Sequence, residues 1–175
     1  GCRVRRDGQL ASVPSGSLTR AIPFRDRPET AVAIPWGDVS TAYYSTGIPN
    51  IEVYAGIPEK QIAWMRRLGK LGPILGLGLV QDFLKRRVEK SVSGPTDEER
   101  TADETLLWGE ARDGSGNTCA MRMRTPEGYT LTAEAAVTAA EQVARGAVPP
   151  GAYTPSTAFG PDFVLSLTGV TCERA

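Results

Sequence analysis

The side chains most able to bind a small polar molecule gather near the start of the chain. Asp38 offers a carboxylate for an amine or a hydroxyl group, and Ser40 and Thr41 add hydroxyls. Tyr43 and Tyr44 offer phenols that orient a ligand or donate a proton. The alternative is structural: an aspartate that caps a helix, followed by an aromatic pair that faces the core. The residues alone leave both interpretations open.

Composition excludes several classes of site. The chain has 175 residues and no histidine, which rules out catalytic triads and zinc sites that need this side chain. Cys2, Cys119 and Cys172 are scattered, so they predict neither a disulfide framework nor a metal site, but reduced thiols in a cytoplasmic protein. Twenty basic and twenty acidic residues cancel, so no overall field attracts nucleic acid or an anionic membrane.

Short strands are expected to surround the polar segment. Asp7 and Gly8 have the turn chemistry of a two-residue β-hairpin, which needs positive φ angles. Residues 18–24, 30–34 and 50–55 are predicted to be further strands. The first third of the chain is therefore expected to be rich in strands.

Two helices are predicted between and after these strands. Asp38 is placed as the N-cap of a short helix that ends before Gly47-Ile48-Pro49. A stronger helix is predicted over 58–68, because apolar residues recur there at helical spacing. Trp64 in this helix is expected to pack in a core or in an interface.

The second half of the chain predicts a hairpin followed by a helix. Residues 105–112 and 118–124 alternate around a Gly-rich turn, and Cys119 in the second strand is expected to be a buried, inert thiol. A helix is predicted over 131–145, capped by Thr130 or Thr132 and stopped by Gly146. This order of elements predicts one α+β domain over residues 1–175, with an antiparallel or mixed sheet covered by helices on one face.

The middle of the chain contains glycines that invite a nucleotide-binding assignment. Gly76-Leu77-Gly78 lacks the preceding strand and the third glycine of a dinucleotide-binding turn. No Rossmann domain is therefore predicted here. The apolar run over 71–80 is too short to span a membrane, and it is expected to be a buried turn before a helix over 79–89.

Three segments carry a resemblance to a known family. They are Pro35-Trp36-Gly37-Asp38-Val39-Ser40-Thr41-Ala42-Tyr43-Tyr44-Ser45-Thr46-Gly47-Ile48-Pro49-Asn50-Ile51-Glu52, Glu127-Gly128-Tyr129-Thr130-Leu131-Thr132, and the tail from Thr154-Pro155 to Leu165. Together they resemble the C-terminal, non-Rossmann domain of saccharopine dehydrogenase-like NAD(P)-dependent oxidoreductases. In such proteins a Rossmann domain comes first, and an α+β domain for substrate and dimer contacts follows.

This resemblance implies hydride transfer between a nicotinamide and a small or acyl substrate. It implies that Asp38, Thr41, Tyr43, Tyr44 and Asn50 contact the substrate, with Tyr43 or Tyr44 as the best candidates for a catalytic acid. The chain does not open on methionine, and we expect it to be the C-terminal part of a longer protein. NAD or NADP is then expected to bind through the missing N-terminal domain. The chain alone is expected to bind no cofactor or metal and to be inactive, and the whole protein to be a homodimer.

The competing interpretation is a non-catalytic domain for dimerisation or protein interaction. It would use Trp64, Ile74, Leu75 and Leu77 as an apolar contact surface. A lipid-handling pocket along residues 68–80 is a third possibility, supported only by apolar composition.

Overall fold

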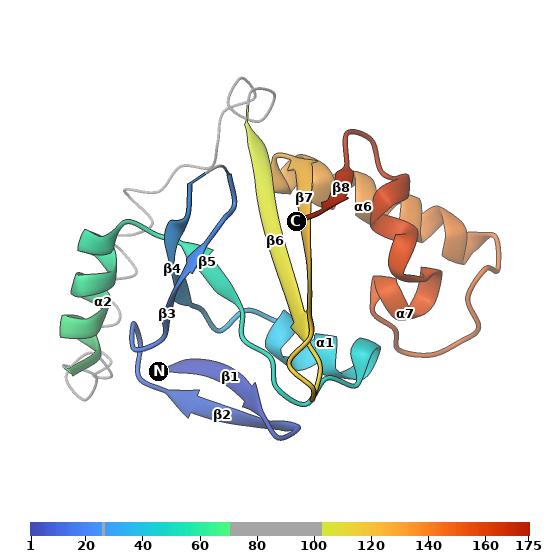
Figure 1. Ribbon diagram of the computed structural model, residues 1–175. Helices are drawn as coiled ribbons and strands as arrows, with labels where there is room; N and C mark the ends of the chain where they lie inside the picture. The colour runs from blue at the N-terminus through green and yellow to red at the C-terminus, as the bar shows by residue number, and fades with distance from the viewer. Residues whose placement is uncertain (26, 71–102) are drawn as a thin grey trace, which may run out of the picture. The chain divides into compact units, whose positions relative to one another are not determined.

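The computed structural model describes residues 1–25, 27–70 and 103–175 (Figure 1). Two compact units divide the chain: Gly1–Pro23 with Arg27–Gly94 form one, and Phe24–Asp26 with Pro95–Ala175 form the other. Both contain helices and antiparallel sheets, so the predicted α+β class is confirmed. The prediction of a single domain stays a prediction. The expected turn at 71–80, the helix at 79–89 and the contact residues Ile74, Leu75 and Leu77 lie outside the described residues.

The first unit opens with the predicted hairpin. Strands β1 (Cys2–Arg6) and β2 (Gln9–Val13) pair antiparallel and in register from Cys2↔Val13 to Arg6↔Gln9. The turn residues Asp7 and Gly8 have φ angles of 48° and 76°. Both values lie in the left-handed region, which the Asp-Gly pair tolerates better than other residues do. This hairpin is confirmed.

A three-stranded antiparallel sheet follows in the same unit. Its strands are β3 (Thr19–Ile22), β4 (Glu29–Ala33) and β5 (Tyr54–Gly56), with β4 in the centre. Consecutive side chains of a strand point to opposite faces, and Ala31, Val32 and Ala33 are all buried. Both faces of β4 are therefore covered. The predicted strand over 50–55 is shorter than expected, and Ile51 instead forms an isolated antiparallel bridge with Arg5.

Helix α1 spans Asp38–Thr46 and ends at Gly47, whose φ of 71° provides the predicted stop. The predicted capping role of Asp38 is wrong. Gly37 is the N-cap residue, no side chain caps the helix, and Asp38 is its first residue. Because an aspartate at this position still faces the positive end of the helix dipole, its charge suits the site without a capping bond.

Helix α2 (Glu59–Lys70) confirms the second predicted helix. Ile62 is buried, and the Nε of Arg66 donates to the carbonyl of Gly16 at 2.6 Å. Trp64 lies on another face of the helix and is 61% exposed. The expected place for Trp64 in a core is therefore wrong, because Ile62 and not Trp64 faces the unit.

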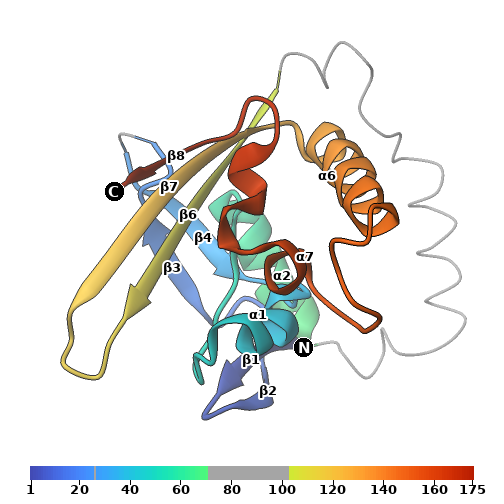
Figure 2. The ribbon, with the colours of Figure 1, turned by 90° about the vertical axis from the view of Figure 1, so that its right-hand side faces the viewer.

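The second unit contains the long hairpin of β6 (Glu104–Arg112) and β7 (Thr118–Pro126), as predicted. Strand β8 (Thr171–Arg174) adds to β7, and Figure 2 shows it beside that strand. Cys119 is exposed, so its predicted burial is wrong. It lies one residue into β7, close to the hairpin turn, where the strand pair leaves its side chains open to solvent.

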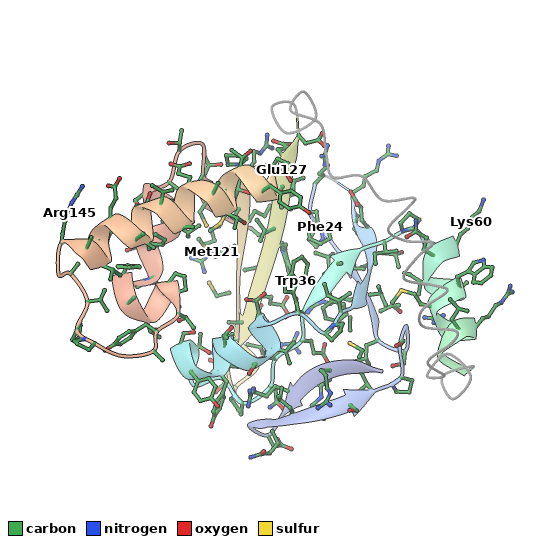
Figure 3. All side chains as sticks on the ribbon, turned by 180° about the vertical axis from the view of Figure 1, so that it is seen from behind. Phe24, Trp36, Lys60, Met121, Glu127 and Arg145 are labelled. Atoms are coloured by element: carbon green, nitrogen blue, oxygen red, sulfur yellow. The ribbon has the colours of Figure 1, made fainter. Side chains whose placement is uncertain are left out.

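Helix α6 (Gly128–Ala144) begins earlier than predicted and contacts β7. Its N-cap is Glu127, whose carboxylate accepts from the backbone N–H groups of Tyr129 and Thr130 at 2.9 and 3.3 Å. Caps at Thr130 or Thr132 are therefore wrong, because both residues lie inside the helix. Gly146 follows the helix with a φ of 78°, as expected of the stop residue. Figure 3 labels Glu127 and Arg145 at the two ends of α6.

The tail of the chain packs beside these elements in the second unit. Helix α7 (Pro155–Phe159) has a capping box between Thr154 and Thr157, and the 3₁₀ helix η1 (Pro161–Ser166) follows it. The rings of Phe159 and Phe163 lie 4.9 Å apart, and Phe163 is buried. Local capping and one aromatic contact therefore order this segment.

Replacing the N-cap of α6 tests its contribution to stability. We expect Glu127→Ala to lower the free energy of unfolding by about 1 kcal/mol, because two backbone N–H groups lose their acceptor. Glu141→Ala is the matched control, since its exposed i,i+4 ion pair with Arg145 should contribute less than about 0.5 kcal/mol. Urea unfolding of the two variants measures the difference, and equal losses would contradict the capping role.

Candidate functional site

A buried arginine lies beneath the polar segment of the first unit. Arg5 is only 5% exposed, although it carries a charge. Its strand neighbour Val4 is also fully buried, so both faces of β1 are covered at this point. Val4 packs into the apolar core, and the side chain of Arg5 reaches α1. A buried cation needs compensating partners, because leaving water is costly for a charge.

Three backbone carbonyls supply those partners. The Nη1 of Arg5 donates to the carbonyl of Gly8 at 2.6 Å. Its Nε donates to Val39 at 3.0 Å, and its Nη2 donates to Ser40 at 3.2 Å. The ring of Tyr43 lies 4.5 Å from the guanidinium carbon, which adds a cation–π contact. One side chain therefore joins the hairpin turn to the first turn of α1.

The segment that follows α1 returns to the same strand. The backbones of Arg5 and Ile51 exchange two hydrogen bonds, at 2.9 and 3.1 Å. The N–H of Gly8 donates to Pro49, and the N–H of Asp7 donates to the Oδ1 of Asn50 at 3.0 Å. Both ends of α1 are thus attached to β1 and its turn. This attachment holds the helix in one position on the hairpin.

The five predicted substrate contacts fall into two groups. Asp38, Thr41 and Tyr44 are exposed on α1, and Tyr44 is 76% exposed. Within the described part of the chain, the carboxylate of Asp38 has neither a hydrogen bond nor an ion pair. Tyr43 and Asn50 instead serve the Arg5 contact and the hairpin turn. Asp38 and Tyr44 are therefore open to a ligand. The hydroxyl of Thr41 donates to the carbonyl of Gly37 at 3.3 Å, so it can offer a ligand only an acceptor. Asn50 is exposed as well, but its Oδ1 accepts from Asp7.

The two tyrosines are brought together but have different surroundings. Their rings lie 5.6 Å apart at an interplanar angle of 73°, an edge-to-face arrangement. Tyr43 is half-buried against Arg5 and Gly8, whereas Tyr44 projects from the helix. Tyr44 is thus the phenol that a bound molecule can reach.

A second polar cluster was not predicted. Glu52 accepts hydrogen bonds from Arg6 and from the hydroxyl of Tyr54, and it forms an ion pair with Arg6. The signal in the sequence was the spacing of Glu52 and Tyr54, two residues apart in an extended segment, which places them on one face. Arg5 was missed as well. Nothing local distinguishes it from its exposed neighbour Arg3.

Hydrogen bonding sets the protonation of this cluster. Burial raises the pKa of Tyr54 to about 12, together with its bond to the Glu52 carboxylate. Burial also acts to raise the pKa of Glu52, but the hydrogen bonds from Tyr54 and Arg6 outweigh it and lower that pKa below its usual value. The cluster therefore contains a neutral phenol and a charged carboxylate at neutral pH. Its donors are already occupied, which makes it a support and not a reactive site.

A Rossmann-type nucleotide site is not seen among the described residues. Such a site holds the phosphates of a dinucleotide at a Gly-rich turn of a parallel βαβ unit, and all strand pairings in the described ranges are antiparallel. In the same part of the chain, no group of three or more His, Cys, Asp or Glu side chains is placed to hold a metal ion. What the arrangement offers is a carboxylate, a hydroxyl and a phenol on one fixed helix.

Comparison with known proteins identifies no relative. No protein-family model matches the chain, and neither a curated protein nor a solved structure matches it. The candidate site is therefore described from its own geometry.

The contacts of Arg5 predict a large loss of stability when its guanidinium is removed. We expect Arg5→Met to lower the free energy of unfolding by about 2–4 kcal/mol, because three charge-assisted hydrogen bonds and a cation–π contact are lost together. Arg3→Met is the matched control on the same strand, and it should change stability by less than about 0.5 kcal/mol because Arg3 is exposed. Urea unfolding checks both values. Similar losses in the two variants would refute the role given to Arg5.

The raised pKa of Tyr54 predicts a loss of stability in alkali. An unperturbed tyrosine has a pKa of 10.0, and that of folded Tyr54 is about 12. The folded protein thus favours the neutral phenol of Tyr54. The contribution of this phenol to the free energy of unfolding is complete below pH 10 and is lost as the pH rises through 12. Absorbance titration should show one tyrosine that ionises late, and Tyr54→Phe should remove it. If Tyr44→Phe removed the late-ionising component instead, the assignment of the raised pKa to Tyr54 would be wrong.

Proposed function

We propose that this chain is the substrate-binding and dimerisation domain of a saccharopine dehydrogenase-like, NAD(P)-dependent oxidoreductase. The proposed reaction is hydride transfer to or from a small or acyl substrate. In this proposal the nucleotide is held by a separate N-terminal domain, and the chain itself supplies the surface that binds and orients the substrate.

The observation that carries the proposal is the surface of α1. Asp38, Thr41 and Tyr44 are exposed on a helix whose two ends are attached to β1 through Arg5 and Ile51. Polar groups on a fixed helix can orient a ligand at low entropic cost, because they do not have to be ordered on binding. The same segment carries the main part of the family resemblance.

The roles of the two tyrosines differ in this proposal. Tyr44 is the residue that contacts substrate, because its ring is largely exposed. Tyr43 is a positioning residue, since it lies against Arg5 and stacks edge-on with Tyr44. Asn50 likewise positions the hairpin turn through Asp7. Asp38 adds a negative charge that suits a substrate amine or hydroxyl group.

Fluorescence titration with NADH and NADPH tests the proposal. The chain of 175 residues should bind neither nucleotide, and a version extended through its native upstream residues should bind one of them. The reason is that the described residues lack a phosphate-binding turn, which the upstream domain is proposed to supply. Tight binding by the short chain, or no binding by the extended one, would contradict the proposal.

Turnover by the extended protein provides the matched comparison. Tyr44→Phe should lower the rate at which substrate oxidises the reduced nucleotide that the extended protein binds, NADH or NADPH, and leave the affinity for that nucleotide unchanged. If Tyr44→Phe changed only the nucleotide affinity, the proposed contact between Tyr44 and the substrate would be contradicted.

A further inference from the structure

Helix α2 packs on the first unit through one face. Ile62 on this face is buried, and Arg66 bonds to Gly16. Gly69, on the same side of the helix, lies beside Ser15. A Cβ added to Gly69 would be 3.8 Å from the Cβ of Ser15. The residues that face the unit thus recur at positions 62, 66 and 69, the spacing of one helix face.

The opposite face is exposed and mixes cations with apolar side chains. A helix advances by 100° per residue, so Lys60, Trp64, Arg67 and Leu68 share the face opposite Ile62. All four are exposed, and we call them the outward face of α2. Figure 3 shows Lys60 pointing away from the helix.

Two cations of the outward face have no partner among the residues that the structure describes. Neither Lys60 nor Arg67 forms a hydrogen bond or ion pair with any residue in the described ranges. The nearest acid in sequence, Glu59, accepts a hydrogen bond from Thr30 at 3.3 Å and so is directed to β4. Although the net charge of the whole chain is zero, Lys60 and Arg67 form a local cationic patch around the exposed indole of Trp64.

A second copy of the chain is a poor occupant for this face. Two-fold pairing would bring the Lys60 and Arg67 of both copies into one small contact, and like charges at short distance repel. Four side chains are also few for a stable protein interface, which has about 20–30 residues on each side. An anionic lipid surface has no such size requirement, and its charge complements both cations.

Tryptophan further favours a lipid surface. Its indole combines an apolar ring with an N–H donor, and it is enriched where hydrocarbon meets lipid headgroups. Lysine and arginine beside it can reach phosphate groups while their aliphatic stems stay near the apolar layer. This is the side-chain pattern of helices that lie on a membrane without crossing it.

We infer that the outward face of α2, formed by Lys60, Trp64, Arg67 and Leu68, attaches the protein to anionic lipid surfaces. The proposed attachment is peripheral. Among the helices that the structure describes, none has the length and apolar character that spanning a bilayer requires. Trp64 and Leu68 enter the headgroup boundary, and the two cations bind lipid phosphates. This inference is independent of the proposed enzymatic function.

Vesicle co-sedimentation of the full 175-residue chain tests the inference. Vesicles that mix phosphatidylglycerol with phosphatidylcholine should bind the protein, and pure phosphatidylcholine vesicles should bind it much less. Lys60→Glu should weaken binding by at least roughly fivefold, and raised salt should act in the same direction. Trp64→Ala should weaken binding by about tenfold through lost apolar contact. All these positions are exposed, so the variants should keep the fold, which circular dichroism verifies.

Trp36→Ala is the matched control. Trp36 belongs to the same unit and is 63% exposed, close to the 61% of Trp64, but it lies outside α2. Its replacement should leave vesicle binding unchanged. Equal losses in the two tryptophan variants, or equal binding to both vesicle types, would overturn the inference. So would a chain that binds no vesicles but self-associates in sedimentation equilibrium, with Trp64→Ala abolishing that association.

Discussion

The buried guanidinium of Arg5 is the interaction on which the first unit depends. It lies between the β1–β2 hairpin and α1, and its donors bind the carbonyls of Gly8, Val39 and Ser40. A planar fork with several donors suits this task, whereas a lysine offers a single point of attachment. Burial of the cation is tolerated because its donors and its ring contact with Tyr43 replace water.

The two polar clusters of the unit have different tasks because their donors are used differently. In the cluster around Glu52, the groups of Arg6 and Tyr54 bond to the carboxylate and leave it little capacity for a ligand. On α1, by contrast, Asp38 and Tyr44 face solvent, and Arg5 fixes the helix by hydrogen bonding to its backbone. The bonded cluster around Glu52 is thus separate from the exposed polar groups of α1, and this separation supports the proposal that α1 binds a ligand.

Local rules predicted much of the fold, and they failed where distant contacts decide. The Asp7-Gly8 turn and the stop at Gly47 follow from backbone preferences, so the sequence was sufficient for both. The cap at Glu127 was missed because threonine is the better N-cap by preference, although the carboxylate reaches two N–H groups here. The exposure of Trp64 was missed because spacing identifies a helix face but not which apolar residue faces the protein.

The candidate site was less predictable than the fold. The sequence pattern includes the exposed side chains of Asp38, Thr41 and Tyr44, but it does not distinguish them from Tyr43, which contacts Arg5 and supports the fold. That difference depends on Arg5, which is separated from α1 by more than thirty residues in sequence. Contacts across such a distance leave no periodic pattern, and so they are visible only in the folded chain.

Arg5 recognises α1 through main-chain oxygens of Val39 and Ser40 and not through their side chains. Every residue type presents the same backbone carbonyl. Substitutions of the side chains at the exposed positions 38, 41 and 44 therefore leave these bonds in place. Mutation can therefore change the surface chemistry of the helix without loosening its attachment. Such a scaffold can evolve new ligand preferences while its stability stays under the separate control of one strand residue.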